Sequence, residues 1–135
     1  MRSQSSGFSL IEIVIAVAIM AIISAIVIPN LMKYVRRARK HATLATLKTV
    51  KNVITEFKDD TRHYPTELNE LVENVEGEKG WDGPYIKKLP LDGWKEDLVY
   101  ILEPKGTRPP YQLYSWGSGG EGSPEEEWIY VDEGA

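Results

Sequence analysis

The sequence predicts an α+β protein in which one long N-terminal helix packs against a small antiparallel sheet of about three strands. Two observations carry this prediction. An apolar run is followed directly by apolar residues at helical spacing, which indicates one helix with a membrane-spanning first half and an amphipathic second half. Three short strand candidates, separated by proline and glycine, then follow near the C-terminus. The 135 residues leave room for an anchor and one small domain.

Residues 8–28 form an apolar run whose polar members are Ser9, Glu12 and Ser24. A helix of this length spans about 30 Å, the thickness of a bilayer core, and a single span in lipid has to be helical. One alternative is a cleaved signal peptide, because residues 16–18 resemble a cleavage site, but the run continues well beyond them. Another is a plain single-span anchor. That alternative leaves Glu12 unexplained, since an ionisable group within a span costs roughly 3 kcal/mol and normally has a partner.

The helix is expected to continue as an amphipathic stem over residues 29–58. Pro29 has no amide hydrogen and should bend or locally open the helix near the membrane boundary. Beyond it, apolar side chains recur every three or four residues, as on a helix face that needs covering. They form two stripes, the first of Leu31, Val35, Ala38, Ala42 and Ala45 and the second of Leu47, Val50, Ile54 and Phe57. We therefore expect one helix from about Phe8 to Lys58.

Residues 59–135 are expected to form a globular head with a C-terminal loop. Thr66 is placed to cap a short helix that Gly77 would end. The strand candidates are Leu98–Leu102, Tyr111–Trp116 and Trp128–Val131. The chain has four tryptophans, Trp81, Trp94, Trp116 and Trp128. We expect them to anchor the core or an interface rather than to form a ligand site.

Charge is distributed unevenly along the chain. Residues 29–41 carry a basic collar of five cations, Lys33, Arg36, Arg37, Arg39 and Lys40. Residues 42–135 carry a net charge of -9. A short basic segment beside an apolar one favours lipid head groups or the acidic heads of neighbouring subunits as partners, rather than nucleic acid.

The sequence offers little for catalysis. It has no cysteine, and neither of its two histidines, His41 and His63, lies at a spacing typical of metal ligands. Asp59, Asp60 and His63 could be drawn as an acid–base group, but such residues are ordinary at a helix end. Residues 117–122 are rich in glycine but do not match a phosphate-binding loop. We therefore expect a structural protein rather than an enzyme.

The start of the apolar run carries a specific motif. The residues Gly7-Phe8-Ser9-Leu10-Ile11-Glu12, followed by the apolar run and Pro29, resemble the signature of the type IV pilin and pseudopilin family. The resemblance implies that residues 1–7 are a leader, that a prepilin peptidase cuts after Gly7, and that the new amine of Phe8 is methylated. It also implies a helical homopolymer, built from subunits that span the bacterial inner membrane once and place their heads in the periplasm.

A new amine on Phe8 would remain cationic after methylation and would give Glu12 a partner of opposite charge on a neighbouring subunit. Two charges that are each costly in lipid become tolerable as a pair, and the pair fixes the register of one helix on the next. We therefore expect Phe8, Glu12 and Pro29 to serve assembly. The basic collar follows the span, so the positive-inside rule favours a cytoplasmic head instead. The motif outweighs that rule here.

A second stretch, from Tyr85 to Trp94, reads Tyr-Ile-Lys-Lys-Leu-Pro-Leu-Asp-Gly-Trp and looks like that of the major pseudopilins of type II secretion systems. This resemblance implies a pseudopilus subunit that drives protein export. Its further partners would be an inner-membrane assembly platform and minor pseudopilins. The alternatives are a type IV pilin used for adhesion, twitching motility or DNA uptake, and an anchored domain that never polymerises. The lack of a cysteine pair near the C-terminus favours the pseudopilin.

Major pseudopilins also carry a glycine-rich acidic loop that binds calcium, and residues 114–127 resemble it. Carried over by position, the ligands would be the carboxylates of Glu126 and Glu127 and the backbone carbonyls of Trp116 and Ser123. Calcium takes roughly six to eight oxygens, and glycines let a loop turn around it. Gly119, however, stands where a ligand aspartate is expected, and glutamate replaces aspartate in the acidic run. A solvated acidic loop is therefore the alternative.

Overall fold

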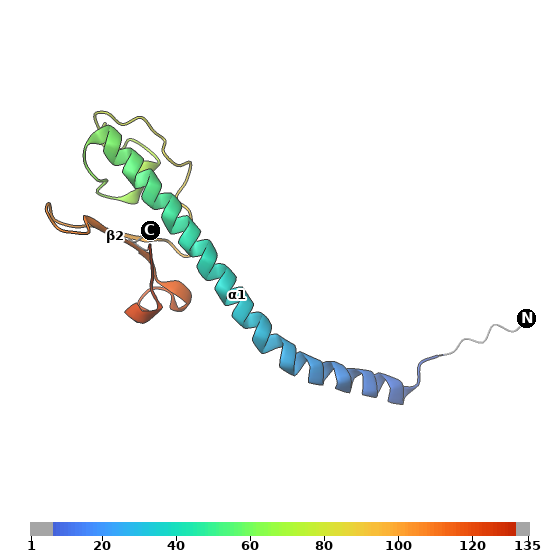
Figure 1. The fold of residues 1–135 in the computed structure, drawn as a ribbon. Coiled ribbons are helices and arrows are strands. Elements are labelled where there is room, and N and C mark those ends of the chain that lie inside the picture. Colours follow the sequence, from blue (N-terminus) through green and yellow to red (C-terminus); the bar gives the residue numbers. More distant parts are fainter. Residues whose placement is uncertain (1–6, 132–135) are drawn as a thin grey trace, which may run out of the picture. The chain divides into compact units, whose positions relative to one another are not determined.

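The computed structural model describes residues 7–131, so residues 1–6 of the expected leader and residues 132–135 lie outside the described part. The first element is helix α1, Leu10–Thr61, which is 52 residues long (Figure 1). Three strands follow: β1, Val99–Leu102; β2, Tyr111–Ser115; and β3, Ile129–Tyr130. One long helix packed against a three-stranded antiparallel sheet confirms the predicted α+β fold class.

The chain divides into two compact units, with the boundary between Arg36 and Arg37. Helix α1 contributes to both units and is continuous through Pro29. The ring nitrogen of Pro29 has no hydrogen to donate to the carbonyl of Ala25, so this turn of the helix lacks one backbone hydrogen bond. The second unit contains the last part of α1 and the whole sheet.

Helix α1 begins at Leu10 and ends at Thr61, rather than at Phe8 and Lys58 as expected. Its end is set by Arg62, whose φ of 71° is left-handed and whose amide donates to Lys58 O at 2.8 Å. This is a common way to end a helix. The hydroxyl of Thr61 donates to Phe57 O at 2.8 Å, so Thr61 still belongs to the last turn.

The second of the two expected stripes forms the centre of the head. Its members Leu47, Val50, Ile54 and Phe57 are all fully buried. Thr43 and Thr61 continue the same face and are buried as well. Fully burying a side chain of this size contributes about 1.5–3 kcal/mol, so this face is what holds α1 to the head.

The first stripe differs from the expectation, because this chain does not cover it. Its members, Leu31, Val35, Ala38, Ala42 and Ala45, are all exposed. Leu31 retains 56% of its accessible surface and Val35 retains 39%. We call these five residues the uncovered stripe. The helical spacing predicted this face, but the residues from 7 to 131 do not cover it.

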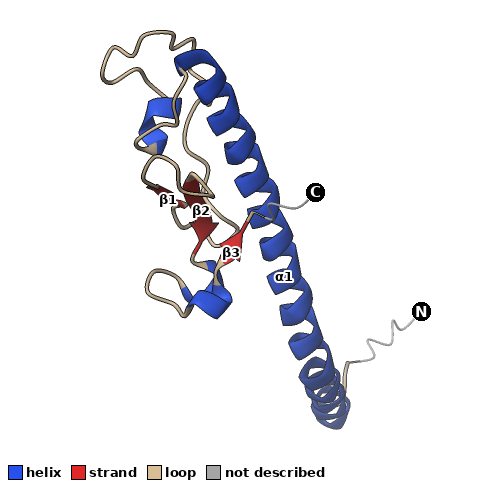
Figure 2. Ribbon diagram, turned by 60° about the vertical axis from the view of Figure 1, so that its left-hand side comes forward, coloured by secondary structure: helices blue, strands red, loops and turns tan. Residues whose placement is uncertain are grey.

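The sheet has the order β1-β2-β3 with antiparallel neighbours, and Figure 2 shows the three strands side by side. In the register, Val99 pairs with Tyr114 and Ser115 pairs with Ile129. Leu113 of β2 and Ile129 of β3 complete the core against the buried face of α1. Each strand lies within the range that the sequence predicted for it.

The short helix expected after Thr66 is a 3₁₀ turn, Leu68–Leu71, and it is shorter than predicted. Thr66 does not cap it, because the residue at the cap position is Glu67. Instead the carboxylate of Glu70 reaches back and accepts hydrogen bonds from the amides of Thr66 and Glu67 at 2.9 and 3.3 Å. A glutamate three residues after the cap is the reciprocal half of a capping box.

The loop before β1 is tied to the head through Asp92, which is buried. Its Oδ1 accepts the amides of Trp94 and Glu96 at 2.8 and 2.9 Å, and its Oδ2 accepts the hydroxyl of Ser115 at 2.5 Å. The next residue, Gly93, donates its amide to Thr43 Oγ1 at 2.9 Å. A Cβ at Gly93 would collide with the backbone carbonyl of Arg39, so only glycine permits this close approach to α1.

Candidate functional site

The N-terminal segment before α1 is the first candidate site. Gly7, Phe8 and Ser9 precede the helix, and Phe8 is 86% exposed. A Cβ placed on Gly7 would meet no atom within 4 Å. Within residues 7–131, packing around position 7 therefore does not require a glycine there.

Glu12 lies in the first turn of α1, where its Oε2 accepts the amide of Ser9 at 2.7 Å. The order Ser9-Leu10-Ile11-Glu12 is that of a capping box, in which the acid three residues into the helix satisfies a free amide at its start. A negative side chain is also favoured there by the helix dipole. The capping-box order is visible in the sequence, although the charge of Glu12 alone predicts only a partner on another subunit.

The apolar part of α1 contains a candidate membrane span. Its most apolar window of 18 residues has a mean hydropathy of 3.0, and none of that window is buried in the chain. Core helices of soluble proteins can be as long and as apolar as this one, but they are mostly buried. The exposure of this segment therefore fits a lipid environment or contact with other copies of the helix.

The second candidate site is the C-terminal loop, residues 116–128. Two 3₁₀ turns form it, one over residues 117–119 and the other over residues 125–127. Gly117 has a φ of 73°, and a Cβ there would collide with Glu127 O. The carbonyl of Trp116 accepts the hydroxyl of Ser123 at 2.7 Å, and the carbonyl of Ser123 accepts the indole N–H of Trp128 at 2.8 Å.

The residues of this loop make a poor fit to calcium. Both expected carbonyl ligands, on Trp116 and Ser123, already accept a hydrogen bond. Within residues 7–131 no group of three Asp, Glu, His or Cys side chains lies close enough together to hold a metal ion. Calcium needs roughly six to eight oxygens, several of them usually from carboxylates. The carboxylate of Glu127 lies beside Gly119, whereas Glu126 makes no hydrogen bond or ion pair with any residue from 7 to 131.

Aromatic rings cover the base of this loop. Tyr114 stacks on Trp128 with ring centroids 4.6 Å apart, and Trp116 meets Trp128 edge to face at 4.8 Å. The other two tryptophans, Trp81 and Trp94, pack against the core. The arrangement of all four is therefore that of packing anchors.

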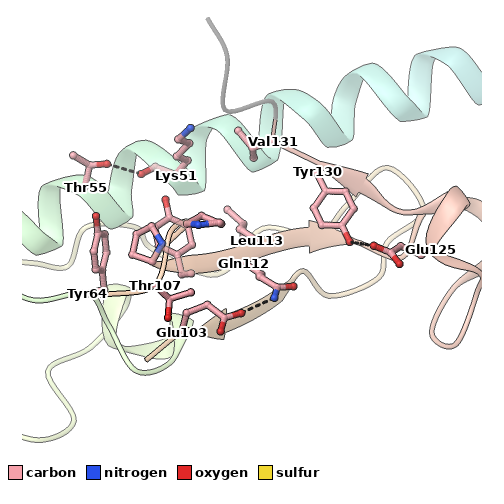
Figure 3. Close-up of a pocket in the computed structure, with 13 residues that line it drawn as sticks. Lys51, Thr55, Tyr64, Glu103, Thr107, Gln112, Leu113, Glu125, Tyr130 and Val131 are labelled. Atoms are coloured by element: carbon pink, nitrogen blue, oxygen red, sulfur yellow. Dashed lines mark hydrogen bonds between the residues drawn. The ribbon is translucent and has the colours of Figure 1, made fainter. Parts of the chain in front are cut away.

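A groove of about 630 Å³ lies on the head between α1 and the sheet (Figure 3). Lys51 and Thr55 line it from α1, and Tyr130 and Val131 line it from the C-terminal side. Its polar groups largely bind one another, since Gln112 donates to Glu103 at 2.5 Å. The described residues that line it include no histidine and no cysteine.

His63 and Asp60, which could be drawn as part of an acid–base group, bind different partners. The Nε2 of His63 lies 3.1 Å from Glu78 Oε1, and its Nδ1 lies 2.9 Å from Tyr64 O. Asp60 instead accepts the hydroxyl of Tyr85 at 2.8 Å. The hydrogen bond to the backbone of Tyr64, followed by that to Glu78, raises the pKa of His63 above its ordinary value of 6.5. Burial raises the pKa of the Tyr100 phenol, which donates to Pro65 O at 2.7 Å.

Comparisons with known proteins agree with these features. The family model described as "Type II secretion system (T2SS), protein G" matches residues 30–131, and that described as "Prokaryotic N-terminal methylation motif" matches residues 2–28. The type II secretion system core protein G of Pseudomonas aeruginosa is 36% identical over 128 residues, which cover 89% of this chain and 88% of that protein. The protein of the same name from Vibrio cholerae is 36% identical over 131 residues, which cover 91% of this chain and 89% of that protein.

A solved structure is similar as well. The crystal structure of the major pseudopilin from the type 2 secretion system of enterohaemorrhagic Escherichia coli has a TM-score of 0.60 and 26% identity, and the match covers 75% of this chain and 92% of that one. The resemblance inferred from the motifs at residues 7–12 and 85–94 is thereby confirmed. This chain belongs to the protein G family of type II secretion systems, a family of structural pseudopilins.

Proposed function

We propose that this chain is the structural subunit of a helical pseudopilus that drives protein export by a type II secretion system. One observation carries the proposal: the same chain joins an N-terminal methylation motif, on an uncovered apolar helix, to a protein G head. The head family supports this role over that of a type IV pilin and over that of an anchored domain that stays monomeric. We propose a purely structural role, without catalysis.

Processing by a prepilin peptidase would occur between Gly7 and Phe8. The geometry supports this, because both residues precede the helix and Phe8 is exposed. A peptidase needs a peptide bond that is free of regular structure, and this one is. A Cβ on Gly7 would meet no described atom within 4 Å, so the close fit of a peptidase around this residue best explains its identity.

Assembly would follow from a change of partner at Glu12. In the uncut chain its carboxylate binds the amide of Ser9 at the start of α1. Cleavage would place a cationic amine on Phe8, next to Ser9, and methylation would preserve the charge. Pairing this amine with Glu12 of an adjacent subunit would offset the cost of a lone carboxylate in an apolar environment, roughly 3 kcal/mol. Pro29, which leaves the carbonyl of Ala25 without its usual donor, would let the packed helices adjust locally.

The subunits would start in the bacterial inner membrane, each with a single pass and a periplasmic head, and would leave it by adding to the filament. The exposed apolar helix supports the membrane-anchored state. The uncovered stripe supports contact between subunits in the filament, because its five apolar side chains stay exposed in the described part of the chain. Further partners would be the assembly platform and minor pseudopilins.

Substitution of Glu12 tests this proposal. Full-length chain is expressed together with its secretion system, and filaments are counted by electron microscopy. Glu12→Gln keeps an acceptor for the Ser9 amide but removes the charge, whereas Glu12→Ala removes both. We expect both variants to be inserted in the membrane and cleaved, and both to form few or no filaments. Ser24→Ala, which changes another polar residue of the same helix without changing charge, should assemble normally.

Normal filaments from Glu12→Ala would contradict the proposed pairing. Normal filaments from Glu12→Gln, together with few from Glu12→Ala, would show that the capping bond and not the charge pair carries assembly.

A further inference from the structure

The C-terminal loop, residues 116–128, is closed at several points by its own hydrogen bonds. We propose that these bonds, and not a bound calcium ion, hold the loop of this chain in shape. The inference concerns the head alone. It therefore holds or fails independently of whether the chain forms filaments.

The first point of closure involves the two backbone carbonyls that the family resemblance assigns to calcium. Each of them accepts a hydrogen bond from a side chain of the loop. The hydroxyl of Ser123 donates to Trp116 O at 2.7 Å, a bond that spans seven residues of the chain. The indole of Trp128 donates to Ser123 O at 2.8 Å. The serine hydroxyl thus links residue 123 to residue 116, and the indole links residue 128 to residue 123.

At Gly119, where the resemblance implies a ligand aspartate, the loop has no room for a longer side chain. A Cβ at this position would lie 2.6 Å from Glu127 Oε2 and 2.7 Å from Ser123 Cβ, both too close for ordinary contact. The side chain of Glu127 therefore occupies the space that an aspartate at 119 would need. Glutamate is one methylene longer than aspartate, which gives Glu127 this reach. The exchange removes one carboxylate from the loop, and calcium affinity depends on the number of charged ligands.

Backbone bonds fix the remaining turns. The amide of Ser123 donates to Gly120 O at 3.1 Å, and the amide of Glu127 donates to Pro124 O at 2.9 Å. At the base, the amide of Gly117 donates to Ser115 Oγ at 3.0 Å, and that hydroxyl donates to the buried carboxylate of Asp92. The loop is thus tied both to itself and to the rest of the head through groups of this chain.

Hydrogen exchange of the loop amides tests the inference. The full-length protein in detergent is exchanged once with excess calcium chloride and once with excess EGTA. We expect the amides of residues 117–127 to exchange at the same rate in both. A calcium site in the loop would slow its opening about 100-fold when calcium is about 100 times above the dissociation constant. Slower exchange in calcium than in EGTA would therefore overturn the proposal.

A pair of serine variants tests the hydrogen bonds themselves. Ser123→Ala removes the bond to Trp116 and should speed exchange of the loop about fivefold, equally in calcium and in EGTA. Ser118→Ala is the matched control, because Ser118 is exposed and its side chain makes no hydrogen bond within residues 7–131. It should exchange at the wild-type rate. Wild-type exchange in Ser123→Ala would show that this network does not hold the loop, and the proposal would fail.

Discussion

The His63 side chain, just beyond the end of α1, lies between two groups that can only accept hydrogen bonds. The carboxylate of Glu78 faces Nε2 at 3.1 Å and the carbonyl of Tyr64 faces Nδ1 at 2.9 Å. A neutral imidazole has a single N–H and can satisfy only one of them. The protonated ring satisfies both, which is why the pKa of His63 is raised. His63 thus joins the end of α1 to the loop that carries Glu78.

We predict that this pair makes the head more stable at acidic pH than at alkaline pH. Because the folded pKa lies above the unfolded value of 6.5, the contribution is fully present below about pH 6.5 and is lost as the pH rises through the raised pKa. The pair is partly exposed, so the contribution should be about 0.5 kcal/mol. Thermal unfolding of the full-length protein, below pH 6.5 and above the raised pKa, measures this contribution.

The matched controls for this prediction are substitutions at Glu78 and at the other histidine. Glu78→Gln removes the charge that faces His63 and should weaken the pH dependence, whereas His41→Gln, at an exposed position of α1, should leave it intact. An unchanged pH dependence in His63→Gln would show that another group is responsible.

Asp92 links the loop before β1 to strand β2 through its buried carboxylate. We predict that Asp92→Asn lowers the free energy of unfolding by about 1–3 kcal/mol, because an amide nitrogen would replace the oxygen that accepts the Ser115 hydroxyl. Urea unfolding of the full-length protein measures the change. Asp97→Asn, at an exposed position of the same loop, should stay within about 0.5 kcal/mol of wild type. Equal values for the two variants would contradict the role given to Asp92.

Residues of this kind were the hardest to predict. Asp92 lies in the stretch that resembles major pseudopilins, but its partner Ser115 is 23 positions away, and no local pattern indicates such a contact. The bond between Glu12 and Ser9 spans only three positions and follows the capping-box pattern, so the sequence was sufficient to predict it. We instead expected Glu12 to bind a charged partner on a neighbouring subunit. Local spacing predicts local bonds, whereas long-range polar pairs need the fold.

At the scale of elements, α1 carries two apolar stripes with different roles. The spacing of three and four residues predicted both, because it reports the face of a helix. Spacing does not say what covers that face. The structure buries the stripe from Leu47 to Phe57 under the sheet and leaves the stripe from Leu31 to Ala45 exposed. The strands were predicted within a residue or two, because proline and glycine bound short runs rich in β-branched and aromatic residues.

We therefore predict that one truncation in each stripe affects a different property, the stability of the head or the formation of filaments. Ile54→Ala removes fully buried methylene and methyl groups and should lower the free energy of unfolding of the head by about 2–5 kcal/mol. Leu31→Ala, in the uncovered stripe, should change it by less than about 0.5 kcal/mol and should instead reduce filament formation. Urea unfolding and counts of filaments distinguish the two. Normal filaments from Leu31→Ala would remove the uncovered stripe from the proposed contacts between subunits.

On the scale of the whole molecule, opposite charges lie on different parts of the chain. The basic collar on α1 makes no ion pair within residues 7–131, and the part of the chain after it carries a net charge of -9. Unpaired cations next to an apolar span fit lipid head groups before assembly and acidic heads of neighbouring subunits after it. Both attractions weaken with salt. This distribution was readable from the sequence alone, whereas the identity of the partner rests on the family.

The central claim is that this chain is a processed, polymerising subunit, and the intact mass of the membrane-extracted protein, with electron microscopy of the overexpressing cells, tests it most directly. We predict a mass that corresponds to cleavage after Gly7 plus one methyl group, together with visible filaments. Gly7→Val is the matched control: open space surrounds Gly7, so the head should unfold as in wild type while the chain remains uncut. An uncut wild-type chain without filaments would contradict the claim and leave an anchored domain that does not polymerise.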